Sequence, residues 1–135
     1  MKTINIIENF CSFQGEGPDT GKRVLILRFK RCSRNCSFCD TALKMRISQE
    51  MKVSLKEIQK LVTNDHLNIL ISGGEPTFST NLNQTIEIIN QIDSNLFNVE
   101  TNGHKLVELI SKVNPEKNIH YMLSPKIFNS ADLKE

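Results

Sequence analysis

Three of the chain's four cysteines lie close together, at Cys32, Cys36 and Cys39. A structural zinc site needs four ligands, which usually come as two separated pairs, and three cysteines cannot all pair in disulfides among themselves. Three thiolates at this spacing suit a 4Fe-4S cluster in which one iron has no protein ligand. That iron can bind the amino and carboxylate groups of S-adenosylmethionine and reduce its sulfonium, which releases a 5′-deoxyadenosyl radical.

Other interpretations of the cysteines are open at this point. Asp40 or the distant His66 could complete a zinc site, and the thiols could simply be reduced and exposed. We interpret Cys11, far upstream, as a small buried apolar side chain rather than a fourth cluster ligand. The three histidines show no mutual metal-ligand spacing and are given no role.

The composition indicates one soluble domain acting on a small molecule. The chain has 135 residues, of which 17 are basic and 15 acidic, giving a net charge of +2. This balance predicts no nucleic acid or membrane partner. No apolar segment is long enough to span a bilayer and no leader is recognisable, so we expect a cytoplasmic protein, whose reducing compartment suits thiolate ligands.

Apolar runs alternate with amphipathic segments along the chain. Strands are predicted at residues 3–7, 24–29, 68–71, 96–99 and 119–123, and helices at 55–64, 82–92 and 106–113. Ser54 and Glu57 form a capping box at the start of the first helix. Residues 10–18 are expected to form an irregular loop because two glycines and a proline lie within it.

Each predicted strand from residue 24 onward ends in a polar motif. Alternating strands and helices build a parallel α/β sheet with right-handed crossovers, and ligands bind at the carboxyl ends of its strands. Four clear parallel strands are too few to close a barrel. We therefore expect a partial, open parallel βα barrel whose polar motifs converge on one edge.

The turn after residue 71 is suited to binding the methionine end of S-adenosylmethionine. Gly73 and Gly74 let the backbone approach a ligand, and Glu75 can accept hydrogen bonds from an ammonium group. Glycine pairs are also common in ordinary turns. The position of this motif, after the first strand beyond the cysteine loop, favours the functional interpretation.

Further polar residues lie at the same predicted edge. Arg28 offers a planar fork that matches a carboxylate. Glu100 and Asn102 could bind ribose hydroxyls or a purine-like edge, or simply cap the next helix. Ser124 and Lys126 could reach the nucleoside or carboxylate of the cofactor, although a single lysine is usually a solvated charge.

Five segments together resemble the 7-carboxy-7-deazaguanine synthase family of radical S-adenosylmethionine enzymes. They are residues 13–17 (Phe-Gln-Gly-Glu-Gly), the cysteine loop with Phe38 running into Asp40 and Thr41, and residues 72–76, 100–103 and 124–126. The resemblance covers nearly the whole chain in the right order. Residues 14–17 and the Cys39-Asp40-Thr41 ending separate this family from other radical enzymes.

The resemblance implies a radical lyase of the 7-deazapurine and queuosine route. Its reaction converts 6-carboxy-5,6,7,8-tetrahydropterin to 7-carboxy-7-deazaguanine with loss of ammonia, and the radical is generated at the cluster rather than by a catalytic side chain. The implied cluster ligands are Cys32, Cys36 and Cys39, and the implied S-adenosylmethionine contacts are Phe38, Cys39, Asp40, Gly74, Ser124, Pro125 and Lys126. The implied pterin contacts are Phe13, Gln14, Gly15, Arg28 and Ser72, while Thr41 would bind Mg²⁺.

Two features depart from the family pattern. Family members continue well beyond residues 124–126, so we expect residues 1–135 to form a single radical S-adenosylmethionine domain that is shortened at its carboxyl end relative to the family. Lys30, Arg31 and Arg34 add positive charge beside the cluster, which would favour an acidic electron donor such as flavodoxin or form only a solvated rim. An open barrel edge would also favour a homodimer.

Two other functions are compatible with the cysteine motif. One is a glycyl-radical activating enzyme, such as the activase of anaerobic ribonucleotide reductase, which shares the cysteine motif but does not explain residues 14–17. The other is a truncated domain that binds a cluster or zinc without catalysis.

Overall fold

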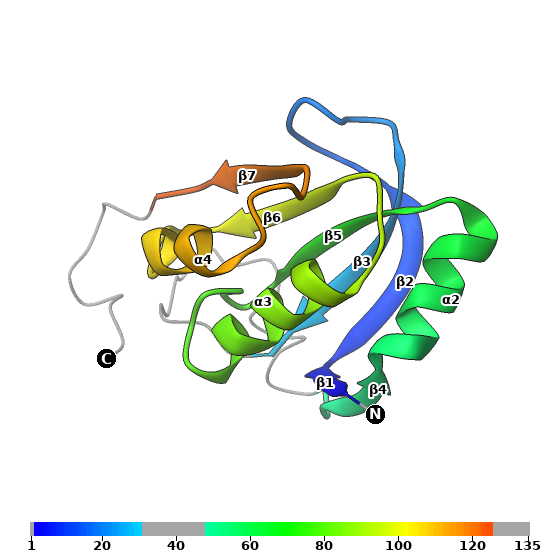
Figure 1. Cartoon of the computed structure of the whole chain (residues 1–135), viewed down its shortest axis with the longest axis horizontal. Helices are drawn as coiled ribbons and strands as arrows, with labels where there is room; N and C mark the ends of the chain where they lie inside the picture. The colour runs from blue at the N-terminus through cyan, green and yellow to red at the C-terminus, as the bar shows by residue number, and fades with distance from the viewer. Residues whose placement is uncertain (1, 31–47, 126–135) are drawn as a thin grey trace.

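A five-stranded sheet forms the centre of the protein (Figure 1). The computed structural model describes residues 2–30 and 48–125. The strand order is β2 (Glu8–Phe13), β3 (Arg23–Phe29), β5 (Asn68–Gly73), β6 (Phe97–Thr101) and β7 (Ile119–Leu123). The last four strands are mutually parallel and β2 is antiparallel to β3. Within the described residues the sheet runs from β2 to β7 without closing, as expected for a partial barrel.

The amino-terminal region differs from its sequence-based prediction. Residues 8–13 form β2, so the irregular loop expected over residues 10–18 begins only after Phe13. Pairing with β3 along six residues satisfies the backbone there, and the glycines and proline lie beyond it. Cys11 is exposed on this edge strand, so the prediction that it is buried was wrong.

A second, smaller sheet joins β1 (Thr3–Ile6) to β4 (Met51–Ser54) in antiparallel register. Sequence patterning predicted the first of these strands but not the second. Strand β4 leads directly into α2 (Leu55–Asp65), whose start was predicted correctly. The Ser54 hydroxyl accepts a hydrogen bond from the Glu57 amide, and the Glu57 carboxylate accepts one from the Ser54 amide, which completes the capping box.

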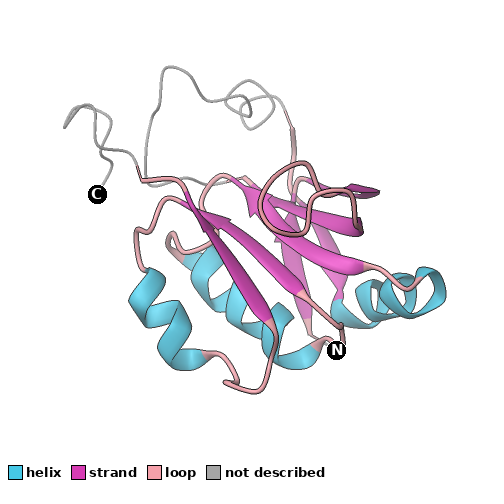
Figure 2. Ribbon diagram, turned by 90° about the horizontal axis from the view of Figure 1, so that it is seen from above, coloured by secondary structure: helices cyan, strands magenta, loops and turns pink. Residues whose placement is uncertain are grey.

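Three described helices cover one face of the large sheet: α2, α3 (Thr80–Gln91) and α4 (Leu106–Lys112) (Figure 2). Alternate residues of each strand point toward them, including the fully buried Leu27, Phe29, Ile71 and Val99. Their burial against Ile58, Ile88 and Leu109 forms the main hydrophobic core. None of the helices in residues 2–30 and 48–125 has the length and apolar character needed to cross a bilayer.

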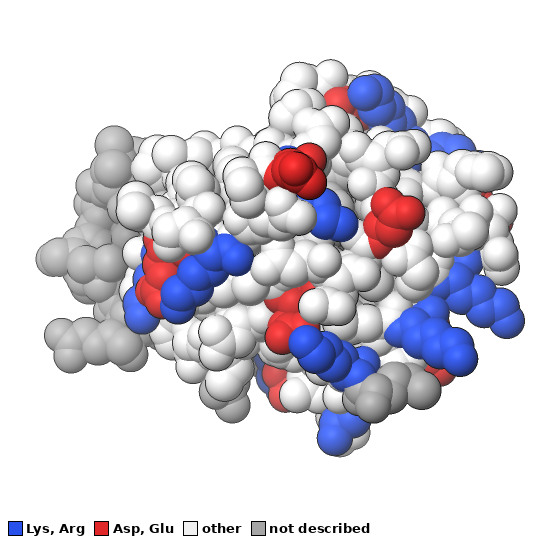
Figure 3. Space-filling view, viewed as in Figure 1, with Lys and Arg blue, Asp and Glu red and all other residues white. Residues whose placement is uncertain are grey.

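The opposite face of the sheet has a different character. It carries a small apolar cluster of Val24, Ile26 and Leu70 with Met122 packed against it. Polar side chains, among them Arg28, Ser72, Asn98 and Glu100, occupy other positions of this face. On the surface seen in the view of Figure 1, acidic and basic side chains are interspersed rather than gathered by sign (Figure 3), so the charge of that surface offers no marked attraction to a polyanion.

Candidate functional site

Polar residues from adjacent strands line up near the carboxyl ends of β3, β5 and β6. Arg28 on β3 lies opposite Glu8 on β2 and Ser72 on β5 in the sheet register. The Ser72 hydroxyl donates a 2.5 Å hydrogen bond to Glu100 at the end of β6. Because alternate residues of a strand share a face, the row lies on the side of the sheet away from the helices. The expectation that polar motifs meet at this edge is confirmed for these residues.

Arg28 is held at the row by an ion pair. Its Nε atom lies 2.6 Å from Glu8 Oε1, and the two side chains are only 17% and 21% exposed. A guanidinium has four further N–H groups, which is the fork that a carboxylate ligand matches. The ion pair therefore holds the arginine beside Ser72, near the carboxyl ends of the strands.

Glu100 has an unusual electrostatic environment for a carboxyl group. Burial raises its pKa above the ordinary value, and the neighbouring Glu16 raises it further, while the Ser72 hydroxyl and the Arg28 charge oppose the rise. Glu16 lies within hydrogen-bonding reach of Glu100. Burial and this neighbouring carboxyl group together make Glu100 retain its proton more readily than an isolated carboxyl does.

The last residue of β5, where the chain enters the turn, must be glycine. Gly73 has φ +116°, and a Cβ atom there would lie 2.3 Å from the backbone N and O of Phe29. The Gly74 amide donates a 2.9 Å hydrogen bond to the Phe29 carbonyl. The turn therefore crosses directly over the end of β3, from which residues 31–47 continue beyond the described region.

Glu75 points into the protein rather than toward the edge. It is 1% exposed, and its carboxylate accepts hydrogen bonds from the Thr77 amide and hydroxyl, the Thr101 hydroxyl and the Asn102 amide. The expected contact of Glu75 with an ammonium group stays a prediction. These hydrogen bonds tie the turn after β5 to the turn after β6.

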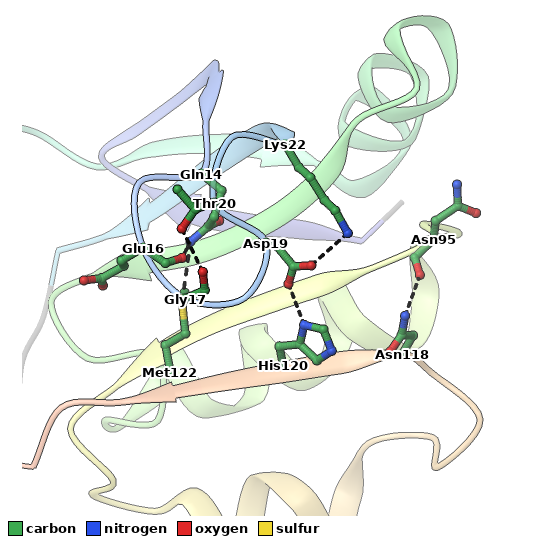
Figure 4. Close-up of polar contacts among 10 residues, drawn as sticks. All are labelled: Gln14, Glu16, Gly17, Asp19, Thr20, Lys22, Asn95, Asn118, His120 and Met122. Carbon is green, nitrogen blue, oxygen red and sulfur yellow. Dashed lines mark hydrogen bonds and ion pairs between the residues drawn. The ribbon is translucent and has the colours of Figure 1, made fainter.

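Residues 14–22 form a loop that lies over the polar face of the sheet (Figure 4). Gln14 is 2% exposed, and its Nε2 atom donates to the Glu16 carbonyl at 3.0 Å and contacts Met122 Sδ at 3.5 Å. Gly15 has open space around it, with nothing within 4 Å of an added Cβ. This loop brings Gln14 and Glu16 to the level of Glu100.

Phe13 does not join the other residues predicted for the pterin site. It pairs with Arg23 at the start of β3, five residues before Arg28, and is 65% exposed. At about 3.3 Å per residue, this places the two positions about 17 Å apart along the strand. Ser124 and Pro125 follow β7 and are exposed, and the Ser124 amide donates to the Thr101 carbonyl at 2.8 Å.

Two buried amide side chains have polar atoms with no partner among the described residues. They are Oε1 of Gln14 and both polar atoms of Asn98, a fully buried residue of β6. Asn98 lies between Leu70 and His120 in the register, facing away from the helices. Buried polar atoms of this kind usually bond to water or a ligand, so the polar face offers donors and acceptors for a bound molecule.

Comparison with known proteins identifies the family. The model of the radical SAM superfamily matches residues 26–134. The chain belongs to the radical SAM superfamily. It is 33% identical over 77% of its length to the 7-carboxy-7-deazaguanine synthase of Haemophilus influenzae and 32% identical over 76% to that of Clostridium acetobutylicum. These matches cover 47% and 48% of the relatives, so the chain spans about half the length of the curated relatives it matches.

A solved structure supports the fold. The crystal structure of QueE from Escherichia coli aligns with a TM-score of 0.64 at 20% sequence identity, covering 98% of this chain and 64% of that one. The resemblance predicted from the motifs is therefore confirmed at the level of relatives and fold. The partial α/β barrel is the architecture that the radical SAM chain shares with that structure.

Membership in this superfamily implies a 4Fe-4S cluster and S-adenosylmethionine as cofactors. The donor set fits such a cluster, because three cysteine thiolates leave one iron open. Several predicted site residues lie outside the described part of the chain: Cys32, Cys36, Phe38, Cys39, Asp40, Thr41 and Lys126. Within residues 2–30 and 48–125, no three His, Cys, Asp or Glu side chains are grouped to hold a metal ion.

Sequence reasoning missed several residues of the polar face. Glu8 was overlooked because residues 8–13 were not recognised as fully strand. Glu16 was noted only as part of a family motif, and Asn98 was hidden within an apolar run. Asp19 and His120 carried no signal, since a single aspartate and a single histidine have no informative spacing. Only the period of two along β6 could have indicated that Asn98 and Glu100 share a face.

Proposed function

We propose that this radical SAM protein converts 6-carboxy-5,6,7,8-tetrahydropterin to 7-carboxy-7-deazaguanine with release of ammonia. The observation that carries the proposal is the row of Arg28, Ser72 and Glu100 across the ends of three parallel strands. Relatives bearing the synthase name support it. Substrate and product differ only by ammonia, so the reaction needs no net oxidant, which agrees with a radical that is regenerated.

The chain's own residues would bind and orient the substrate. Arg28 pairs with the substrate carboxylate, which gains from a charge-assisted bidentate contact in a sheltered position. Ser72, one strand away from Arg28, and Glu100, two strands away, accept from or donate to the polar edge of the fused heterocycle. Gln14 covers the ring from the loop above. The cluster and S-adenosylmethionine, when bound, would supply the radical for hydrogen abstraction, and the residues named here would hold the substrate in place for it.

The cofactor side of the site is proposed from the sequence and the turn geometry. Cys32, Cys36 and Cys39 would hold the cluster, while the backbone at Gly74 and Ser124 would border the methionine and nucleoside ends of S-adenosylmethionine. Thr41 would bind Mg²⁺, which prefers oxygen ligands and would also hold the substrate carboxylate. The remaining implied cofactor contacts are Phe38, Asp40, Pro125 and Lys126.

Further proposals concern the protein as a whole. We propose that residues 1–135 act as a single domain, that a flavodoxin-like protein supplies the electron, and that the enzyme works in the cytoplasm. The basic residues Lys30, Arg31 and Arg34 support an acidic donor. Exposed apolar side chains on the edge strand β2, Phe10 and Phe13, support a homodimer.

An anaerobic turnover assay tests the proposed function. The reconstituted chain is mixed with S-adenosylmethionine, a reductant, Mg²⁺ and 6-carboxytetrahydropterin. The products are separated by chromatography and identified by mass spectrometry. We expect 7-carboxy-7-deazaguanine. Formation of 5′-deoxyadenosine alone would retain the radical chemistry and remove the substrate assignment.

Two variants of the same strand sharpen this assay. Arg28→Ala should lower kcat/KM for the pterin at least about hundredfold without changing the iron content, because it removes a charged contact to the substrate. Arg23→Ala is the matched control, since Arg23 lies at the other end of β3 and donates to the Asp65 carbonyl. Full activity of Arg28→Ala would show that the carboxylate is bound elsewhere.

A further inference from the structure

The 14–22 loop is closed at its neck and extends over the polar face of the sheet. The Gln14 amide donates to the Lys22 carbonyl at 2.8 Å, and the Gly21 amide donates to the Gln14 carbonyl at 2.9 Å. Its ends therefore meet while its middle projects toward β7 (Figure 4). Because the ends of the loop lie together, the contacts that its middle residues make with the sheet determine where the loop lies.

Two residues of β7 contact the loop. His120 and Met122 are two positions apart on one strand and so share a face. Met122 contacts Gln14. It also leaves no room for a side chain at position 17, because a Cβ atom on Gly17 would lie 2.6 Å from Met122 Sδ. Gly17 has φ +80°, a conformation that glycine adopts readily. The loop thus packs closely on the strand at Met122.

The second contact is a hydrogen bond between the loop and His120. Asp19 Oδ2 lies 2.5 Å from His120 Nδ1, and Asp19 Oδ1 lies 2.9 Å from Lys22 Nζ. The Asp19 side chain is 3% exposed, whereas those of His120 and Lys22 are 39% and 57% exposed. A buried carboxylate is tolerated only when it is paired, and Asp19 is paired by Lys22 within the loop and by His120 on β7. Of these two partners only His120 ties the loop to the sheet.

We propose that Asp19 and His120 are positioning residues whose hydrogen bond seats the 14–22 loop on β7 and so places Gln14 and Gly15 against the substrate. This inference rests on the proposed function for the identity of the substrate. The same strand continues into Ser124 and Pro125, the predicted border of the cofactor. The pair consequently connects the loop that covers the substrate to the strand that leads to the cofactor.

Hydrogen exchange of the substrate-free chain tests the attachment directly. His120→Phe and Asp19→Asn should each increase amide exchange of residues 14–22 about tenfold relative to the wild type, because the loop opens more often. His120→Asn retains a donor near the Nδ1 position and should restore most of the protection. His66→Asn is the matched control, since the exposed His66 ends α2 in a left-handed conformation that asparagine accepts.

Steady-state kinetics tests the role in substrate positioning. His120→Phe should raise KM for the pterin about tenfold and leave kcat within about twofold, while KM for S-adenosylmethionine stays unchanged. A double variant with Asp19→Asn should be no worse than either single variant, because both remove the same contact.

The outcomes separate this inference from the proposed function. Unchanged exchange of residues 14–22 in both variants would overturn the attachment, and faster exchange with an unchanged pterin KM would overturn the positioning role. If the wild-type chain forms no deazaguanine product, the proposed function and its substrate fail, whereas the exchange measurement still decides whether Asp19 and His120 hold the loop.

Discussion

The carboxylate of Glu75 accepts a 2.5 Å hydrogen bond from the hydroxyl of Thr101, a residue 26 positions further along the chain. The same carboxylate accepts the Asn102 amide at 2.7 Å. One buried side chain thereby fixes the spacing between the turns that follow β5 and β6. Thr77 extends this connection, since its hydroxyl donates to Glu75 and accepts from the Lys105 amide at the start of α4.

Glu75→Gln should destabilise the chain even without cofactors. A glutamine side chain has one acceptor oxygen, so its NH₂ group would replace an oxygen that now faces N–H or O–H donors. The unsatisfied buried group should lower the free energy of unfolding by about 1–3 kcal/mol, measured by urea denaturation of the cofactor-free chain. The exposed Glu116→Gln serves as control. An unchanged unfolding midpoint with weaker S-adenosylmethionine binding would instead support the role of Glu75 as a cofactor ligand.

Asn98→Leu should stabilise the substrate-free chain. The two polar atoms of Asn98 are buried without a partner in the described part of the chain, and leucine has a similar shape without polar groups. We expect the free energy of unfolding to rise by about 1 kcal/mol, while Asn98→Ala lowers it by leaving a cavity. Equal losses in both variants would show that a firmly bound water or another group satisfies the amide.

Glu100→Gln should flatten the dependence of stability on pH. Burial and Glu16 raise the pKa of Glu100 above its ordinary value of 4.5, so the folded chain holds this proton more tightly than the unfolded chain. The stabilisation is complete below pH 4.5 and is lost as pH rises through the folded-state pKa. The wild type should lose more stability than Glu100→Gln between about pH 5 and pH 7, measured by thermal unfolding.

A matched comparison identifies the source of this effect. Glu16→Gln removes the neighbouring charge but leaves Glu100 buried, so the pH dependence should shrink without disappearing. Parallel pH curves for the wild type and Glu100→Gln would show that Glu100 ionises as an ordinary carboxyl group in the folded chain.

The periodic parts of the fold were predictable from sequence because their signals are local. The capping box at Ser54 and the apolar period of α2 lie within a dozen residues of one another, and the parallel strands are short buried runs. Strand β2 was missed because it is an edge strand, with exposed side chains at Phe10 and Phe13 that give it no clean alternation. The convergence of polar motifs followed from topology alone.

The inward orientation of Glu75 could not be predicted from the sequence. A Gly-Gly-Glu turn is compatible with a glutamate that faces a ligand or the interior, and the choice depends on Thr101 and Asn102 from a different strand. The contact between Asp19 and His120 likewise could not be predicted from the sequence, since it depends on where the nine-residue loop packs against the sheet. Tertiary contacts decide the partners of single polar residues, and no local pattern encodes them.

The 101-residue separation between Asp19 and His120 also bears on how the protein acquires its shape during synthesis. The 14–22 loop leaves the ribosome early, whereas β7, which the loop contacts, is the last strand of the described sheet to be synthesised. Contacts that span so much chain form late, because the intervening segment must first be ordered. Until His120 emerges, the Asp19 carboxylate of the nascent chain stays in water, and the described sheet lacks its edge strand β7.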